Sequence, residues 1–158
     1  GAARAVDHHK TDFAAFGLFV VAHEFDVVIG AQRGAAYGQA GRLDQARIRF
    51  GDAPQGHKQF EGDERTPEGR YTINGRNPAS AYHLSLGLNY PQADDIARAR
   101  AGGYDPGGDI FLHGQPNVLP AQSLLRHDWT AGCVAVTDRQ MEVIYSMVKP
   151  GTVIHILP

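Results

Sequence analysis

Glycine and proline set the strongest limit on what this chain can fold into. Its 158 residues include 19 glycines and nine prolines. These residues separate short apolar runs such as GLFVV, EFDVVIG, ARIRF, GRYTI, AYHLSLGL, DIFLHG and GTVIHI. Apolar runs of this length between turn-forming residues are typical of strands. The sequence therefore predicts a mainly β domain in which many short strands are joined by turns.

Two segments have the pattern of helices instead. Residues 91–103, PQADDIARARAGG, begin with a proline and end at paired glycines, which predicts a short surface helix. In the second segment Thr137 and Gln140 form a capping-box pattern. Apolar residues then recur at helical spacing: Met141, Ile144, Tyr145 and Val148. The sequence Lys-Pro-Gly ends the segment. Residues 30–45 have no clean periodicity and predict a long glycine-rich loop or insertion.

Length and charge narrow the class of protein. The chain is 42% apolar and 20% charged, which fits one domain spanning residues 1–158, and we expect a monomer. Fifteen basic and 17 acidic side chains give a net charge of −2, and no basic block is present, so nucleic acid is not an expected partner. No run approaches the roughly 18 apolar residues of a transmembrane segment.

The segment DWTAGCVAVT, residues 128–137, contains the chain's one cysteine, Cys133. A single thiol has no internal disulfide partner, so it is packing material, a metal ligand or a nucleophile. Other side chains of metal-binding type are present: His83, His113, His127 and Asp128. No pair among them has the short regular spacing of a zinc site.

A nucleophilic thiol needs a nearby base and donors for the oxyanion that forms when it attacks a carbonyl. His113 ends the apolar run DIFLH, and Cys133 begins the run CVAVT. If these runs form neighbouring strands, the imidazole and the thiol face each other across one cleft. Gly132 would let the backbone approach a substrate closely. The residues alone leave the packing, metal and catalytic interpretations open.

Several motifs together resemble a known family. The pair His113-Gly114 precedes TAGC, residues 130–133, with fifteen residues between them, and a Thr-Pro-x-Gly turn lies at residues 66–69. This arrangement resembles the L,D-transpeptidase catalytic domain family (YkuD type), and the ending from residue 128 is most similar to its YafK-like murein branch. The resemblance covers residues 46–158, whereas residues 1–45 match poorly.

The resemblance implies a fold and a set of roles. The fold would be mainly β with a few short helices, a mixed sheet or open β-sandwich. Cys133 would be the nucleophile, His113 its base, and the Gly114 carbonyl would orient the imidazole. The N–H groups of Gly132 and Cys133 would form the oxyanion hole. The resemblance implies no metal and no organic cofactor, and a periplasmic or cell-envelope location after removal of a signal peptide.

The resemblance also implies a reaction on peptidoglycan stem peptides through a thioester acyl-enzyme. An amine acceptor would give a 3→3 cross-link, lipoprotein attachment or D-amino-acid exchange. Water as acceptor would make the protein an L,D-carboxypeptidase, or an amidase that releases attached lipoprotein. A non-catalytic wall-binding module is the alternative from another class.

The sequence departs from the commonest form of the motif at two positions. Ala131 and Ala135 stand where that form has histidine before the glycine and arginine or asparagine two places after the cysteine. Substrate contacts are therefore expected from five other side chains: Thr130, Trp129, Tyr82, His83 and Arg65. Arg70 and Arg126 are further candidate cations for a substrate carboxylate. Trp129 would either stack on the donor peptide or fill the core, and the arginines would otherwise be solvated.

Overall fold

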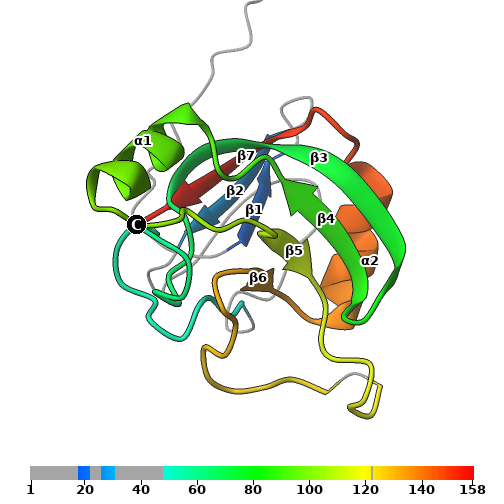
Figure 1. Cartoon of the computed structure of the whole chain (residues 1–158). Coiled ribbons are helices and arrows are strands. Elements are labelled where there is room, and N and C mark those ends of the chain that lie inside the picture. The colour runs from blue at the N-terminus through cyan, green and yellow to red at the C-terminus, as the bar shows by residue number, and fades with distance from the viewer. Residues whose placement is uncertain (1–17, 22–25, 31–47, 122) are drawn as a thin grey trace, which may run out of the picture.

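The computed structural model describes residues 18–21, 26–30, 48–121 and 123–158, and these form a curled sheet with two helices (Figure 1). The strand order is β1-β2-β7-β3-β4-β5-β6. The pairs β2–β7 and β5–β6 are parallel and the other pairs are antiparallel, so the sheet is mixed. The strands are β1 (Leu18–Val21), β2 (Asp26–Gly30), β3 (Gly69–Ser80), β4 (His83–Leu88), β5 (Phe111–His113), β6 (Val134–Ala135) and β7 (Val153–Leu157). This architecture confirms the predicted mainly β, mixed-sheet fold.

Strand β3 connects the two halves of the sheet. Its first residues pair with β7, and from Ile73 onward it pairs with β4. The run GRYTI predicted only a short strand here, because Gly75 and Pro78 look like breaks. The strand instead continues for 12 residues, with register shifts after Ile73 and after Asn77 that absorb the irregular positions. The resulting bend turns the β4–β5–β6 end away from β7, as the curved ribbon of β3 shows (Figure 1).

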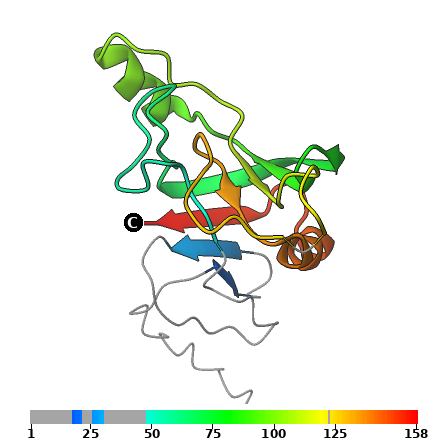
Figure 2. The ribbon, with the colours of Figure 1, turned by 90° about the horizontal axis from the view of Figure 1, so that it is seen from below.

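The two predicted helices are confirmed. Helix α1 (Ala93–Ala101) has a capping box between Gln92 and Asp95, and Gly102 lies at its end. Helix α2 (Asp138–Met147) is capped by Thr137, whose hydroxyl accepts from the Gln140 N–H as the sequence predicts. Figure 2 shows α1 and α2 at opposite ends of the molecule, with β3 and β7 running between them.

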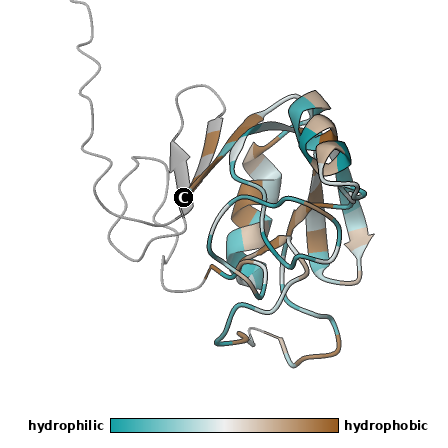
Figure 3. Cartoon of the chain, turned by 60° about the vertical axis from the view of Figure 1, so that its left-hand side comes forward, coloured by the Kyte–Doolittle hydropathy of each residue, from teal (hydrophilic) through white to brown (hydrophobic). Residues whose placement is uncertain are grey.

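The core lies between the sheet and α2. Apolar residues follow the strands, whereas the loops are mainly hydrophilic (Figure 3). The most completely buried side chains come from β2, β3, β4, β5, α2 and β7: Ile29, Ile73, Leu86, Leu112, Met141, Ile144, Ile154 and Ile156. Burial of such side chains contributes about 1.5–3 kcal/mol each relative to exposure.

Some predictions differ from the structure or fall outside it. Of the run ARIRF, the described residues 48–50 form an isolated bridge between Arg49 and Ala135, not a strand. This bridge nevertheless covers the open side of the short strand β6. The predicted glycine-rich loop lies outside the described residues from position 31 onward. None of the described helices has the length and apolar character to cross a membrane.

Candidate active site

The site is built on the parallel pair β5–β6. Leu112 pairs with Val134, and His113 pairs with Ala135. This confirms that the runs carrying His113 and Cys133 are neighbouring strands. Side chains alternate along a strand, so His113 and Cys133 lie on the face opposite to Leu112 and Val134, one diagonal step apart. Strand spacing puts their Cα atoms about 8 Å apart.

The tautomer of His113 follows from its hydrogen bond. Its Nδ1 lies 2.7 Å from the Gly114 carbonyl oxygen. A carbonyl only accepts, so Nδ1 carries the proton and Nε2 presents a lone pair. A side chain at position 114 would not fit, because a Cβ there would lie 2.6 Å from Asp138 Oδ1 and 3.0 Å from the Tyr82 carbonyl oxygen. Gly114 thus allows the chain to turn where its carbonyl holds the imidazole.

Two aromatic rings fix the plane of the imidazole. The Tyr82 ring stacks on His113 with centroids 4.5 Å apart, and Trp129 lies tilted at 5.7 Å from His113 and 5.8 Å from Tyr82. Trp129 Nε1 is buried and has no hydrogen-bond partner in the part of the chain that the structure describes. The three rings make one aromatic cluster on the β5 side of the site.

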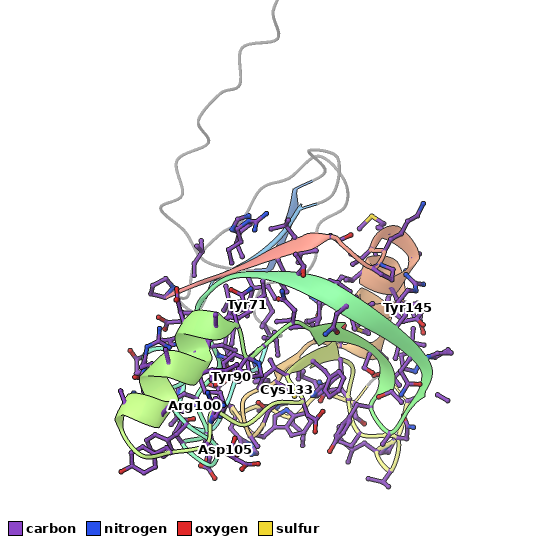
Figure 4. All side chains as sticks on the ribbon, turned by 45° about the horizontal axis from the view of Figure 1, so that its top comes forward. Tyr71, Tyr90, Arg100, Asp105, Cys133 and Tyr145 are labelled. Atoms are coloured by element: carbon purple, nitrogen blue, oxygen red, sulfur yellow. The ribbon has the colours of Figure 1, made fainter. Side chains whose placement is uncertain are left out.

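The thiol contacts main-chain atoms of residues 109–111. Sγ of Cys133 accepts from the Phe111 N–H at 3.4 Å and donates to the Asp109 carbonyl oxygen, also at 3.4 Å. Asp109 has a φ of 53°, in the left-handed region, and this conformation accompanies the inward direction of its carbonyl. In this conformation the thiol proton therefore lies on a backbone carbonyl. Figure 4 shows Cys133 in the middle of the molecule, between the part carrying Tyr90 and helix α2 with Tyr145.

Burial keeps both groups uncharged at rest. It raises the pKa of the Cys133 thiol, and Asp109 adds to the rise, while the Phe111 N–H and the Lys58 ammonium oppose it without reversing it. Burial also lowers the pKa of His113, and the Gly114 carbonyl offsets only part of that shift. Near neutral pH the pair is therefore a thiol and a neutral imidazole, not an ion pair.

The loop before Cys133 is held by Thr130. Its hydroxyl donates to the Cys133 carbonyl at 2.6 Å and accepts from the Gly132 N–H at 3.2 Å. The Cys133 N–H has no hydrogen-bond partner among the described residues. Of the two donors expected for an oxyanion hole, Cys133 N–H is thus available, whereas the Gly132 N–H is engaged within the loop.

Residues 50–66 support this loop from the other side. The Thr130 N–H donates to the Phe50 carbonyl, and the Thr66 hydroxyl accepts from the Gly51 N–H at 3.0 Å. Gly132, at φ +135°, lies against the Arg65 carbonyl: a Cβ at this position would be 2.8 Å from that oxygen. The Thr66 hydroxyl and the Arg65 carbonyl thus brace the segment that presents the cysteine, whereas residues 66–69 do not form the predicted turn, since Gly69 begins β3.

The structure brings some of the predicted substrate contacts to the site and takes others elsewhere. Tyr82, Trp129 and Thr130 lie beside His113 or Cys133. The imidazole of His83 instead bonds Glu142 of α2 at 3.0 Å. Arg65 reaches the site only with its main chain, since its guanidinium lies beside Gly56. No group of three or more His, Cys, Asp or Glu side chains suited to a metal gathers among the described residues.

Several residues at the site were not predicted from the sequence. Asp109 and Phe111 act through main-chain atoms, which leave no signal in residue type. The main chain of Arg49 bridges Ala135, one of the two motif positions occupied by alanine, and its Nε donates to the Leu125 carbonyl. Lys58 is buried beside Gly132, although a lysine in a polar segment gives no reason to expect burial.

Comparisons with known proteins point to one family. The family model YkuD, the L,D-transpeptidase catalytic domain, matches residues 21–156, and so includes residues 21–45, which the motif resemblance leaves out. YafK of Escherichia coli (strain K12), whose name assigns it to the L,D-transpeptidases, is 30% identical over 113 residues, covering 70% of this chain and 39% of that protein.

Solved structures are similar as well. The helical cell shape determining protein Pgp2 of Campylobacter jejuni matches with 28% identity and a TM-score of 0.54, covering 69% of this chain and 36% of that one. Its K307A mutant matches with 25% identity and a TM-score of 0.59, covering 84% and 46%. An L,D-transpeptidase of Stackebrandtia nassauensis, at 14% identity, a TM-score of 0.51 and coverage of 94% and 62%, is similar in fold alone. The chain spans less than half the length of YafK and Pgp2.

Proposed function

Because the chain belongs to the L,D-transpeptidase catalytic domain family, we propose that it is a cysteine-dependent acyltransferase that acts on peptidoglycan stem peptides through a thioester. One observation carries the proposal. The parallel pairing of β5 with β6 puts an imidazole with a free Nε2 lone pair on the same face as the chain's one thiol. A wall-binding module would need neither group.

The first half-reaction starts from the neutral pair. The thiol leaves the Asp109 carbonyl, and Nε2 of His113 takes its proton as Sγ attacks the substrate carbonyl carbon at the bond between an L-centre and a D-residue. The Gly114 carbonyl stabilises the imidazolium through Nδ1–H, in the position that a carboxylate has in many triads. The new C–S bond leaves a negative charge on the carbonyl oxygen.

That oxyanion is held by main-chain donors. The Cys133 N–H is available, and the Gly132 N–H joins it when the oxyanion displaces the Thr130 hydroxyl as the stronger acceptor. The tetrahedral intermediate then expels the amine of the D-residue, His113 gives the proton back to that amine, and a thioester on Cys133 remains.

A second nucleophile resolves the thioester. An amine of a neighbouring stem peptide, of a lipoprotein or of a free D-amino acid gives cross-linking, attachment or exchange, with His113 taking the amine proton. These acceptors lie in the cell envelope, and so we place the protein in the periplasm or envelope.

Hydrolysis is the second candidate, and one observation favours it. Ala131 and Ala135 stand where the commonest motif has polar side chains, so these positions offer no hydrogen bond to an acceptor amine. Water as acceptor makes the protein an L,D-carboxypeptidase or an amidase. The similarity to a protein named for helical cell shape suits an enzyme that remodels the wall by either route.

Acylation is tested with a carbapenem and intact-protein mass spectrometry. Wild type should gain the mass of one carbapenem, Cys133→Ala should gain none, and His113→Gln should react more than about 100-fold slower because it lacks the base. Labelling of Cys133→Ala at the wild-type rate would refute the nucleophile assignment.

Incubation with purified muropeptides then identifies the acceptor. Dimers indicate transfer, shortened monomers indicate hydrolysis, and Cys133→Ala controls for contaminating enzymes. Unchanged muropeptides, with intact carbapenem acylation of the same sample, would contradict the proposed substrate class.

A further inference from the structure

Lys58 is a buried cation next to the loop that presents the thiol. Its side chain is 3% exposed, and its Nζ lies 3.6 Å from the position that a Cβ would take at Gly132. The neighbouring Arg65 carbonyl closes the same side of the loop. The ammonium thus lies close to Gly132, on the side of the loop that the Arg65 carbonyl and the Ile110 side chain also face.

Lys58 forms an ion pair with Asp63, with Nζ 2.9 Å from Oδ1. The Asp63 carboxylate also accepts three main-chain N–H groups, from Gln59, Phe60 and Arg65. Burial alone would raise the pKa of Asp63, but these bonds and the lysine together lower it. The Lys58–Asp63 pair therefore accounts for the burial of both charges, and it holds the ammonium group close to the loop that presents the thiol.

Burying an ammonium group costs several kcal/mol unless the group is paired, and Asp63 provides that pairing here. The groups beside Lys58 that become negative are those of the proposed reaction: the Cys133 sulfur and the oxyanion bound at the Cys133 N–H. Lys58 already acts on the first, since it opposes the rise in the thiol pKa caused by burial and by Asp109. An opposite charge within a few ångströms favours the charged form of such a group.

We propose that Lys58 is a positioning residue whose buried positive charge, acting through the Gly132–Cys133 peptide, stabilises the thiolate and the oxyanion of the site. Its catalytic meaning rests on the proposed function. Its effect on the thiol does not, because ionisation of the thiol is measurable without any substrate.

The test is the pH profile of Cys133 alkylation by iodoacetamide. Lys58→Met removes the charge, so the apparent pKa of the thiol should rise, and alkylation at pH 8 should become about tenfold slower, as expected for one pKa unit. Lys58→Arg keeps the charge and should restore the rate to within about threefold. Lys149→Met is the matched control: Lys149 is exposed beyond the end of α2, and its loss should leave the profile unchanged.

A purely structural role for Lys58 predicts a different pattern. The melting temperature of Lys58→Met would fall while the alkylation profile stayed that of wild type, and this result would overturn the proposal. If Lys58→Met fails to fold, Lys58→Gln replaces it, since glutamine retains a donor for Asp63 without the charge. A wild-type profile for Lys58→Gln would equally refute the inference.

The two proposals fail separately. A shifted alkylation profile in Lys58→Met, with no muropeptide turned over by wild type, supports the role of Lys58 and removes the proposed substrate. Turnover of muropeptides by wild type, with an unshifted alkylation profile in Lys58→Met, supports the proposed substrate and refutes the role of Lys58.

Discussion

The centre of the sheet and its β5–β6 edge are held by different interactions. At the centre, β7 pairs with β2 on one side and β3 on the other, through four residue pairs each, and its Ile154 and Ile156 are buried. At the edge, β5 has three residues and β6 two. There the ladder is short, and side chains bind the main chain instead: Asp128 accepts from the Phe50 N–H, and Asp138 accepts from the Gln115 N–H.

The difference has a physical reason. A strand that pairs with a neighbour on each side and buries apolar side chains has its position fixed by the sheet itself. Two or three residue pairs are too few to fix the position of a strand in this way. The edge therefore depends on loops, which can place polar main-chain atoms toward a substrate. We infer that substitutions at the centre change mainly stability, whereas substitutions at the edge change mainly the chemistry.

The largest effect is expected at the centre. Ile154→Ala should lower the free energy of unfolding by about 3 to 4 kcal/mol, through lost burial and the remaining cavity. Carbapenem acylation, measured well below the melting temperature, should keep the wild-type rate. Denaturant unfolding provides the stability, and Val118→Ala at an exposed loop position is the control, with less than about 0.5 kcal/mol expected. Slow acylation in folded Ile154→Ala would show that the centre also sets the site geometry.

The next effect is on the chemistry. In Gly132→Ala the new Cβ would meet the Arg65 carbonyl at a φ of +135°, so the loop must move. Acylation should slow by about 100-fold, equivalent to about 2.7 kcal/mol in the barrier. Gly75→Ala, at a position in β3 with no heavy atom within 4 Å of the added Cβ, is the matched control and should acylate normally. Equal rates for both variants would remove Gly132 from the site geometry.

Gln115 connects the edge to its loops. It is 2% exposed, its amide donates to the Val136 carbonyl, and its side-chain oxygen accepts from the Leu125 N–H. Gln115→Leu has a similar volume but leaves both main-chain groups unpaired, so we expect a loss of about 2 kcal/mol in unfolding free energy. Acylation should also slow, because Gln115 follows the His113-Gly114 pair directly. A loss of stability with an unchanged acylation rate would show that Gln115 contributes to stability alone, like the residues at the centre of the sheet.

The acidity of His113 gives a smaller effect that belongs to the edge alone. Because burial lowers the pKa of His113, acylation should rise through a midpoint below the ordinary histidine value of about 6.5, where Nε2 loses its proton. The folded state favours the neutral ring, so this contribution to stability is complete above that ordinary value and is lost as pH drops toward the folded-state pKa. The loss is about 1.4 kcal/mol for each pH unit that separates the pKa of the unfolded chain from that of the folded protein. His113→Gln should lose this part of the stability profile, and Ile154→Ala should retain it. A midpoint above 6.5 would instead indicate an ion pair at rest.

The sequence predicted the parts of the molecule in which residue type and spacing determine the structure. The capping box at Thr137 and Gln140, the paired glycines after α1 and the two runs ending or beginning at His113 and Cys133 all have local causes. The length of β3 was underestimated, because the bulges that accommodate Gly75 and Pro78 depend on pairing with distant β4. The roles of Arg65 and His83 as substrate contacts stay predictions.

What the sequence could not indicate is where main-chain atoms point. The Asp109 carbonyl and the Phe111 N–H bind the thiol whatever their side chains are, and the Gly132 N–H is engaged because Thr130 lies two residues before it. Lys58 shows the same limit, since its burial results from the packing of residues 50–66 against the cysteine loop and not from any local pattern.

The smallest effect is expected where the two regions meet. Arg76 of β3 donates to the Tyr145 and Val148 carbonyls at the end of α2, and its guanidinium lies 3.9 Å from the centre of the Tyr145 ring. Helix α2 has no basic residue in its last turn, so Arg76 provides the favourable charge there. Arg76→Met should cost about 0.5 to 1 kcal/mol of stability, with Arg70→Met, at an exposed position of β3 outside any helix, as the stability control.

The acylation rate of Arg76→Met decides whether α2 belongs to the centre or to the edge. The other end of α2 carries Asp138, which accepts from the Gln115 N–H and lies close to Gly114. If the helix moves as a rigid body, loosening its far end displaces Asp138 and slows acylation. We expect an unchanged rate, because the Thr137–Gln140 cap fixes the first turn independently of the last. A slower rate would mean that the edge takes its geometry from the centre through α2, and the division between the two regions would not hold.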